Sequence, residues 1–410
     1  MPRSSELPTS ATSSATDGGR SGLAARRASL VIFSIMAFLA AFYIFLKAYE
    51  LRAGDPTATT LKVDFIVFWA AAKLALAGDA LAAFDPAVLT AAAGLSPETA
   101  NNLLWLYPPG FMALIAPLGL LPYWAAWSGF FVGSAACLAL AFRGPARELP
   151  GGWRLVVVAP VVLIGCLAIG QNSVLWTAAL VAALWAMRHD KAVLAGFWIA
   201  LLTLKPQLGL LIPVALIAGR EWRVLAWATG WAVALILIST AAFGIQYWGH
   251  FLAGLSTATS HVEQGRMPIH HLVSFYGFVR AIGASHSGAL GAQLVVSAVT
   301  AVAIAWIWSR KHTGADLKYA ALCAAIPLAT PYAFYYEMTL TLAAAVFLVR
   351  DGFGRGYLGK LWLLIIWFGP VPALYLPSVT TIAAVTPPIL VITVAICVLR
   401  VHACERSDPN

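Results

Sequence analysis

The sequence has little charge. Only 10% of its 410 residues are charged, whereas 61% are hydrophobic. A soluble protein has roughly 45–50% apolar and about 25% charged residues, so this composition excludes a soluble enzyme, a disordered chain and a secreted disulfide scaffold. The sequence also lacks a Walker A motif, a GxGxxG motif, an HExxH motif and a nucleophile-elbow serine. ATP and cytosolic nucleotide sugars therefore have no support as substrates, and a polytopic membrane protein remains.

Metal-ligating residues are scarce or poorly spaced. The five cysteines form no CxxC pair and lie mostly in apolar runs, where we interpret them as small buried hydrophobic residues. Most histidines fall between residues 244 and 289, but neither the adjacent His270 and His271 nor the pair His261 and Glu263 has the spacing of a dedicated site. We therefore expect no metal cofactor.

Apolar runs of helical length follow one another along the chain, which predicts an all-α polytopic fold. Residues 1–28 are rich in Ser, Thr, Ala and Gly and are expected to form a disordered tail. Residues 29–402 are interpreted as one transmembrane domain, followed by a short tail at 403–410. The apolar runs lie at about 29–49, 108–142, 155–169, 173–187, 191–207, 208–219, 224–243, 290–309, 319–331, 334–349, 358–376 and 382–400.

The distribution of Lys and Arg predicts the topology. Prolines leave two interpretations of the block at 108–142, either a half-helix plus one span or two spans. One span gives about twelve transmembrane helices and places most basic residues on one side, as the positive-inside rule requires. We therefore expect both termini in the cytoplasm, the protein in the inner (cytoplasmic) membrane, and outer regions at about 50–107 and 244–289. The net charge of +9 then reflects topology and requires no nucleic acid.

Asp64 is the candidate catalytic residue. It precedes a short apolar segment, residues 65–77, which is too short to span a bilayer and is expected to lie as a helix on the outer membrane surface. A carboxylate at this junction can act as a general base on a hydroxyl group. The alternative is that Asp64 caps the N-terminus of this helix, and the two roles do not exclude each other.

Two further motifs on the outer side offer contacts to a sugar. Tyr107 is followed by two prolines, which fix an extended segment and then start a helix; this corner either shapes a groove for a lipid or sugar or is a simple turn. The amides of Gln171 and Asn172 lie between two apolar runs and can hydrogen-bond sugar hydroxyls, unless Asn172 only caps the next helix.

Lys205 lies deep in an apolar segment, next to a proline that breaks the helix. A lysine there is costly unless it is paired or faces a wet cavity, so it is a candidate for binding a phosphate. The alternative is that its side chain snorkels to the outer interface. Gln207, two residues later, is a candidate for orienting the sugar.

The segment Pro331–Glu337 is aromatic and ends with an acid before an apolar helix. Tyr336 and Glu337 are candidates for binding the sugar or acceptor, or they belong to an aromatic belt with an acid at a helix N-terminus. Arg266 and Arg280, in the second outer region, are candidates for phosphate contacts or are ordinary solvated charges.

The chain resembles the polytopic mannosyltransferase-like proteins of glycosyltransferase family 87, which have the C-type glycosyltransferase fold. The resemblance covers about residues 29–400, and the matching segments occur in the order of the family. These segments are Asp64-Phe65 with Phe68-Trp69, Tyr107-Pro108-Pro109, Gly170-Gln171-Asn172, Lys205-Pro206-Gln207 and the segment from Pro331 to Glu337.

The resemblance implies an inverting glycosyltransferase that uses a polyprenyl-phosphate sugar, with mannose expected, and a lipid or glycan acceptor on the outer face of the cytoplasmic membrane. The acid of the first outer loop is the implied base, which corresponds to Asp64, with Asp55 as the competing choice. Lys205, assisted by Arg266 or Arg280, is expected to stabilise the leaving phosphate. The residues expected to contact sugar or acceptor are Tyr107, Gln171, Asn172, Gln207, His270, Tyr336 and Glu337.

Two other classes of protein fit the same pattern. Broken helices with polar residues at membrane depth also describe a secondary transporter or a flippase-like carrier. The large outer regions, and the lack of matched breaks in the two halves of the chain, favour the enzyme over the carrier. A non-catalytic partner in lipid-linked glycan handling is the third reading, and the presence of Asp64 and Lys205 disfavours it.

Overall fold

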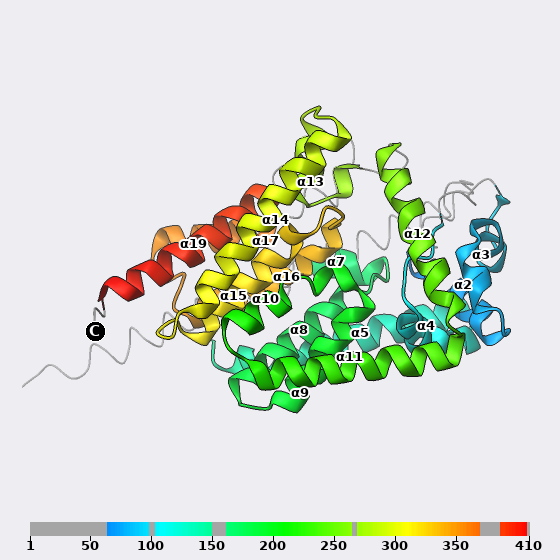
Figure 1. Cartoon of the computed structure of the whole chain (residues 1–410), viewed down its shortest axis with the longest axis horizontal. Coiled ribbons are helices and arrows are strands. Elements are labelled where there is room, and N and C mark those ends of the chain that lie inside the picture. Colours follow the sequence, from blue (N-terminus) through cyan, green and yellow to red (C-terminus); the bar gives the residue numbers. More distant parts are fainter. Residues whose placement is uncertain (1–63, 98–102, 150–160, 265–268, 370–385, 408–410) are drawn as a thin grey trace, which may run out of the picture.

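The computed structural model describes residues 64–97, 103–149, 161–264, 269–369 and 386–407, and in these residues it is helical (Figure 1). The first apolar run at 29–49, Asp55 and Arg266 lie outside the described residues. The α-helices are α2 (Phe65–Leu76), α3 (Pro86–Ala92), α4 (Pro109–Ile115), α5 (Tyr123–Arg147), α7 (Val161–Ala168), α8 (Ser173–Arg188), α9 (Ala192–Leu201), α10 (Ile212–Ala218), α11 (Trp222–Phe243), α12 (Gln246–Glu263), α13 (Phe275–Ala281), α14 (His286–Ser309), α15 (Ala315–Ala325), α16 (Thr339–Arg350), α17 (Tyr357–Phe368) and α19 (Thr386–Ser407). The 3-10 helices are η2 (Ala80–Phe84), η4 (Ala116–Leu120), η5 (Leu202–Leu204), η6 (Pro206–Leu208), η7 (Ile269–His271), η8 (Ile326–Ala329) and η9 (Tyr335–Met338).

The all-helical membrane fold is confirmed at this level. Among the described residues, α5, α11, α14 and α19 are long and apolar enough to cross a membrane. The other apolar helices are shorter because breaks interrupt them, as η5 and η6 do between α9 and α10. Two finer expectations stay predictions: that the chain has about twelve spans, and that these spans have the arrangement of the C-type glycosyltransferase fold.

The apolar block at 108–142 forms a short helical segment followed by one long helix. The helix α4 begins at Pro109, as the two prolines predict, and η4 continues it to Leu120. Pro122 then precedes α5, whose 25 residues run on to Arg147. These lengths agree with the half-helix plus one span, since only α5 of these segments is long and apolar enough to cross a membrane, and the number of crossings stays a prediction.

Ion pairs join the helix ends at one end of the bundle. The side chain of Arg350, at the end of α16, is 3% exposed and pairs with Asp316 (2.9 Å) and Glu148 (2.7 Å). These pairs join the end of α16 to the start of α15 and to the end of α5. Arg188, at the end of α8, also pairs with Asp316, and Arg400 on α19 pairs with Asp351. All these residues lie in segments that we expect on the cytoplasmic face.

The opposite ends of α8 and α16 carry the candidate site residues. The helix α8 begins at Ser173 and ends at Arg188, and α16 begins at Thr339 and ends at Arg350. At 1.5 Å per residue, the 16 residues of α8 span about 24 Å. The ion-pair cluster and the candidate site are therefore separated by most of the thickness of a bilayer.

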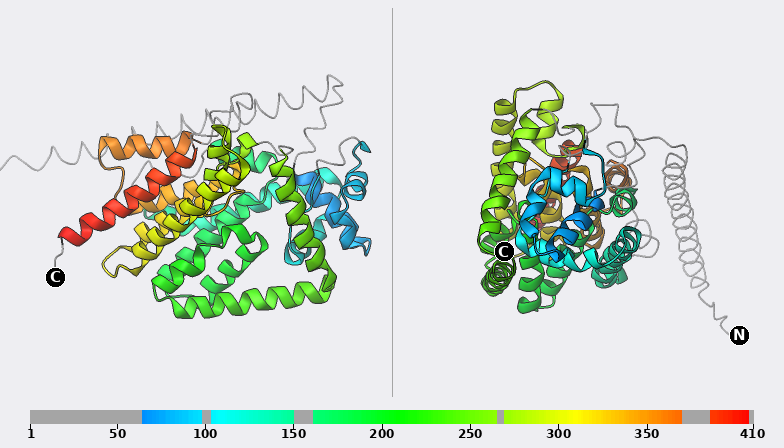
Figure 2. Two further views of the ribbon diagram at one scale, coloured as in Figure 1. Left: turned by 45° about the horizontal axis from the view of Figure 1, so that its top comes forward. Right: turned by 90° about the vertical axis from the view of Figure 1, so that its right-hand side faces the viewer.

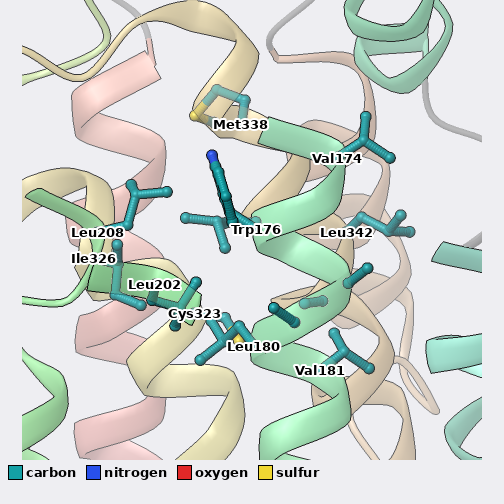
Figure 3. Packing of buried hydrophobic residues seen from close by; sticks show 14 of the residues in the cluster. Val174, Trp176, Leu180, Val181, Leu202, Leu208, Cys323, Ile326, Met338 and Leu342 are labelled. Atoms are coloured by element: carbon teal, nitrogen blue, oxygen red, sulfur yellow. The ribbon is translucent and has the colours of Figure 1, made fainter. Parts of the chain in front are cut away.

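The hydrophobic core lies directly between these two ends. Figure 3 shows Trp176, on the first turns of α8, among Leu202, Leu208, Ile326 and Met338. Each of these residues is buried, and they come from α8, from the broken segment η5–η6, from η8 and from η9. This packing fixes the same segments that carry the polar residues of the candidate site.

The two outer regions expected from the sequence pack against each other. Trp105 Nε1 donates a hydrogen bond to the hydroxyl of Tyr247 on α12 (2.7 Å), and the ring of Phe84 packs against Tyr247 with centroids 5.0 Å apart. Figures 1 and 2 show α12 standing beside α2 and α3. The contact holds α2, and with it Asp64, against the rest of the molecule.

Candidate active site

Asp64 lies at the start of α2, where its side chain makes no capping hydrogen bond. Its carboxylate instead accepts a hydrogen bond from Gln171 Nε2, with Nε2 and Oδ2 2.5 Å apart. The backbone N–H of Phe65 donates to the carbonyl of Ile169 (3.2 Å). Asp64 is therefore the residue that precedes α2, but the alternative that its side chain caps this helix is wrong, because the carboxylate is held by the turn between α7 and α8. Asp64 is exposed as a residue, and its contact with Gln171 is partly buried.

Gly170 makes this contact between two distant segments possible. Its φ of +68° is in the left-handed region, which favours glycine. A Cβ at this position would lie 2.5 Å from the Cβ of Phe65, closer than carbon atoms approach without displacement. The lack of a side chain at Gly170 therefore allows the start of α2 to approach the turn and places Gln171 beside Asp64.

Asn172 and Ser173 bind the ammonium of Lys205. Lys205 Nζ donates to Asn172 Oδ1 (3.3 Å) and to Ser173 Oγ (3.2 Å). Lys205 is only 4% exposed, and it lies between η5 and η6 with φ −136° and ψ 75°, where the helix is interrupted. The helix break is therefore confirmed, and the alternative that Lys205 snorkels to the interface is wrong.

Glu337 completes the buried pairing. Its Oε1 lies 2.5 Å from Lys205 Nζ, and its Oε2 accepts a hydrogen bond from Ser173 Oγ (3.0 Å). Glu337 lies in the first turn of η9, directly before α16, so the alternative of an acid at a helix N-terminus is confirmed in that part. At 1% exposed, however, its side chain is buried rather than at an interface. Five side chains thus form what we call the buried network: Gln171, Asn172, Ser173, Lys205 and Glu337.

Three hydroxyl-bearing residues of this region were not among the residues singled out from the sequence. Ser173 links Lys205 to Glu337, and Thr177, one turn later on α8, lies 2.7 Å from Thr339 (Oγ1 to Oγ1). Thr339 also lies close to the carbonyls of Ser173 (3.4 Å) and Tyr336 (3.2 Å). The spacing of Ser173 and Thr177 puts both on one face of an otherwise apolar helix, and this pattern was the available signal.

The charged partners determine which way each amide points. Lys205 can only donate, so Asn172 must present Oδ1 to it, and Gln171 presents Nε2 to the carboxylate of Asp64. The other amide atoms, Gln171 Oε1 and Asn172 Nδ2, are buried and have no hydrogen-bond partner. A buried polar atom without a partner is costly, so one free acceptor and one free donor next to Asp64 are suited to a hydroxyl-bearing ligand.

Two tyrosines cover the buried network. Lys205 Nζ lies 4.9 Å from the centroid of the Tyr336 ring, a cation–π distance. The Tyr107 hydroxyl lies beside Asn172 and within electrostatic reach of Asp64 and Glu337, although it accepts no well-formed hydrogen bond from Asn172 Nδ2. Both tyrosines are half-buried, which leaves part of each side chain accessible.

The structure does not bring every candidate residue to this place. Arg280 Nη1 donates to the carbonyl of Ala284, just after α13 (3.0 Å), and in the described part of the chain it makes no hydrogen bond or ion pair with the buried network. Gln207 is half-buried and has no hydrogen bond to Lys205 or Asp64. The side chain of His270 and the whole of Arg266 lie outside the described residues. Their expected roles stay predictions.

The histidines of the second outer region are distributed over separate contacts. His286 lies between the hydroxyl of Tyr276 (2.9 Å from Nδ1) and Glu263 (2.9 Å from Nε2), and His250 packs against Phe84. In the described part of the chain, no group of three His, Cys, Asp or Glu residues could hold a metal ion. The expectation that the reaction needs no metal stays a prediction.

The comparison with known proteins gives one match. A model of glycosyltransferase family 87 matches residues 105–331, which is more than half of the chain. Among curated proteins and among solved structures, none matches this chain. The matched segment contains Tyr107, Gln171 and Lys205. Asp64 and Glu337 lie on either side of it in the sequence, and the structure brings both into contact with it.

Proposed function

Because the chain belongs to glycosyltransferase family 87 and is a membrane glycosyltransferase, we propose that it moves a sugar from a polyprenyl-phosphate donor to a lipid or glycan acceptor. Mannose is the proposed sugar, and the outer face of the cytoplasmic membrane is the proposed location. The observation that carries the proposal is Asp64 itself, which is exposed as a residue at the start of α2 and has its carboxylate held by Gln171, near the buried ammonium of Lys205.

Asp64 acts in this proposal as the general base. It removes the proton from the acceptor hydroxyl while that oxygen attacks C1 of the sugar, and the bond from C1 to the lipid phosphate breaks on the opposite face. The configuration at C1 is therefore inverted. Gln171 supports this role because its Nε2–H···Oδ2 bond fixes the direction of the carboxylate, leaving the other carboxylate oxygen available to the hydroxyl.

The leaving phosphate needs positive charge. Lys205 supplies it in the proposal, although its three N–H donors are already directed at Glu337, Asn172 and Ser173. Lys205 therefore stabilises the leaving phosphate through its electrostatic field, or it exchanges one of these partners for a phosphate oxygen. Arg266 and Arg280 are proposed to assist from the second outer region, and a lipid monophosphate leaves without needing a metal.

The sugar is bound by the free amide atoms and the tyrosines. Both atoms are buried in this structure, so the proposal includes a movement that opens the turn: Gln171 Oε1 then accepts from a sugar hydroxyl and Asn172 Nδ2 donates to one, which gives both atoms a partner. The exposed edges of Tyr107 and Tyr336 pack against the apolar face of the sugar. His270, Gln207 and Glu337 are the further proposed contacts, and Glu337 reaches the sugar only if it releases Lys205 or Ser173.

An apolar pocket supports a lipid-linked donor. A cavity of about 340 Å³ lies between α9, α10 and α11, and Pro206, the neighbour of Lys205, is part of its wall. The other lining residues are nearly all apolar, among them Leu202, Leu210 and Leu225. A hydrocarbon chain in this pocket would bring its phosphate end close to the segment that carries the buried cation.

The test is transfer of a labelled sugar. Purified protein is incubated with labelled polyprenyl-phosphate-mannose and a membrane lipid extract, and labelled products are separated from the donor. We expect transfer by the wild type and a loss of about 10²–10⁴-fold in Asp64→Asn. Asp79→Asn is the matched control, because Asp79 caps η2 and asparagine caps equally well. Asp55→Asn tests the competing base, and a wild-type rate in Asp64→Asn would exclude Asp64.

A carrier is the second candidate function. The observation that favours it is the interrupted helix at Lys205, since transporters often build their sites from broken helices. Sealed vesicles containing the purified protein distinguish the two functions. Movement of the labelled lipid across the bilayer without any transfer of sugar would support the carrier and contradict the transferase.

A further inference from the structure

Ser173 occupies the centre of the buried network although it contacts neither Asp64 nor any exposed surface. Its hydroxyl donates to Glu337 Oε2 (3.0 Å) and accepts from Lys205 Nζ (3.2 Å). One donated and one accepted bond, both to charged groups, leave the hydroxyl a single orientation. Ser173 is 1% exposed, so this arrangement does not exchange with water.

The same residue begins α8, immediately after the turn that holds Asp64. Gln171 and Asn172 precede it, and Asn172 Oδ1 is bound by the same ammonium. The carbonyl of Ser173 lies 3.4 Å from Thr339 Oγ1, which fixes the first turn of α8 against the start of α16. The bonds that converge on Ser173 therefore hold the α8 end of the turn that carries Gln171, while the backbone bond from the Gln171 N–H to the carbonyl of Cys166 (3.0 Å) holds its α7 end.

The charges of the pair make a purely stabilising role a poor explanation. Burying an ammonium and a carboxylate costs desolvation energy, and well-packed apolar residues of similar volume are often as stable or more so. The charged pair instead restricts the orientation of the Ser173 hydroxyl, which must point its hydrogen at Glu337 and its oxygen at Lys205. Resting on the proposed transferase function, we propose that Ser173, with the Lys205–Glu337 pair, is a positioning residue that sets the orientation of Gln171 and, through it, of the Asp64 carboxylate.

Removing the hydroxyl should then affect the chemical step. In Ser173→Ala, Lys205 and Glu337 each lose a partner and the turn is free to shift, so Gln171 no longer directs Asp64. We expect kcat to fall roughly 10- to 100-fold with little change in KM for the donor, since the lost effect concerns the transition state. Thr341→Ala is the matched control: Thr341 is also buried, but its hydroxyl bonds only the carbonyl of Met338 in its own segment.

A double-mutant cycle separates positioning from general structure. If Ser173 acts through Asp64, then Ser173→Ala should have almost no further effect on the residual rate of Asp64→Asn, because there is no base left to orient. Glu337→Gln, which keeps the side-chain volume, is measured in the same cycle and is expected to behave in the same way, so the test holds even if Ser173→Ala does not fold.

The outcomes are distinct. A lower kcat in the single variants that disappears in the Asp64→Asn background supports the inference. An unchanged kcat, or an equal fold-loss with and without Asp64, overturns it, since the effect would then not pass through the base. A wild-type protein that transfers no sugar contradicts the proposed function itself, and the inference falls with it. The melting temperature of each variant is recorded in parallel.

Discussion

Lys205 and Glu337 form an ion pair inside the protein: Nζ lies 2.5 Å from Oε1, and the two side chains are 5% and 2% exposed. The pair joins the break between α9 and α10 to the start of α16. The side chains that hydrogen-bond the pair, Asn172 and Ser173, are neutral, so each charge depends on the other for compensation. The contact also explains how an acid outside the matched family segment becomes part of the site.

The first prediction concerns the interdependence of this pair. Lys205→Met leaves Glu337 buried without its counter-charge, and we expect it to cost about 3–5 kcal/mol of stability. The double variant Lys205→Met with Glu337→Leu should lose much less stability than the sum of the losses in the two single variants, because no buried charge is left unpaired. Thermal unfolding of the purified variants measures this. Losses that simply add in the double variant would show that the two charges are independent.

The second prediction concerns Gly170. Gly170→Ala introduces a Cβ 2.5 Å from the Cβ of Phe65 and a residue with φ of +68°. The left-handed conformation alone costs about 1–2 kcal/mol, and relief of the clash must move α2 away from the turn. We expect a lower melting temperature and loss of most transfer activity, because Asp64 moves away from Gln171.

Gly249→Ala is the control for this substitution. Gly249 lies on α12, and a Cβ there would meet nothing within 4 Å. Alanine favours a helix over glycine by about 1 kcal/mol, so this variant should be as stable as the wild type or more so, with unchanged activity. Equal activity in both alanine variants would mean that the close approach of Phe65 to Gly170 has no part in placing Asp64.

The sequence predicted most of the helices because each carries its own signal. Prolines at 108 and 109 predicted where α4 begins, and the short apolar segment after Asp64 predicted α2. The lengths were harder to predict: Lys205-Pro206 marks the break at η5 and η6, but η8 shortens its run with residues that are all apolar (Ile326–Ala329). Only packing against neighbouring helices satisfies the backbone groups at such breaks.

The site was predictable as a set of residues but not as a set of contacts. Asp64 and Lys205 were identifiable because a charge in an apolar segment is costly and needs a reason. Their partners were not, since hydrogen bonds from Gln171 to Asp64 and from Ser173 to Glu337 connect residues far apart in sequence. Ser173 was overlooked because a serine at the start of a helix is ordinary, and only the fold shows that it bridges two charges.

The third prediction is a pH effect. Gln171→Glu replaces the amide that donates to Asp64 with a carboxyl group of nearly the same size. A second negative charge at this distance disfavours the ionised form of Asp64 and raises its pKa. The base is then protonated over a wider acidic range, so the acid limb of the rate profile should move to higher pH and the rate at neutral pH should fall.

The measurement is the dependence of kcat/KM on pH, which reports the free enzyme. Gln171→Leu is measured beside it, because it removes the hydrogen bond without adding a charge and should lower the rate with a smaller displacement of the acid limb. An acid limb that stays at the wild-type position in Gln171→Glu would show that the titrating base is not Asp64.

The last prediction concerns the two faces of the membrane. The helix α14 has 24 residues from His286 to Ser309, and about 36 Å of helix is enough to cross the roughly 30 Å hydrocarbon core. Its first end adjoins the second outer region, and its last end adjoins the ion-pair cluster near Arg310. We therefore expect Ser287→Cys to be labelled by a membrane-impermeant maleimide on intact cells, and Lys311→Cys to be labelled only after permeabilisation. Both positions are exposed, and the exposed native residues Cys137 and Cys404 are replaced by alanine in the background.

The opposite result, labelling of Lys311→Cys but not of Ser287→Cys on intact cells, would place the Asp64 end of the molecule on the cytoplasmic face. The sugar donor would then have to reach the site from the cytoplasm, which contradicts the location that we propose.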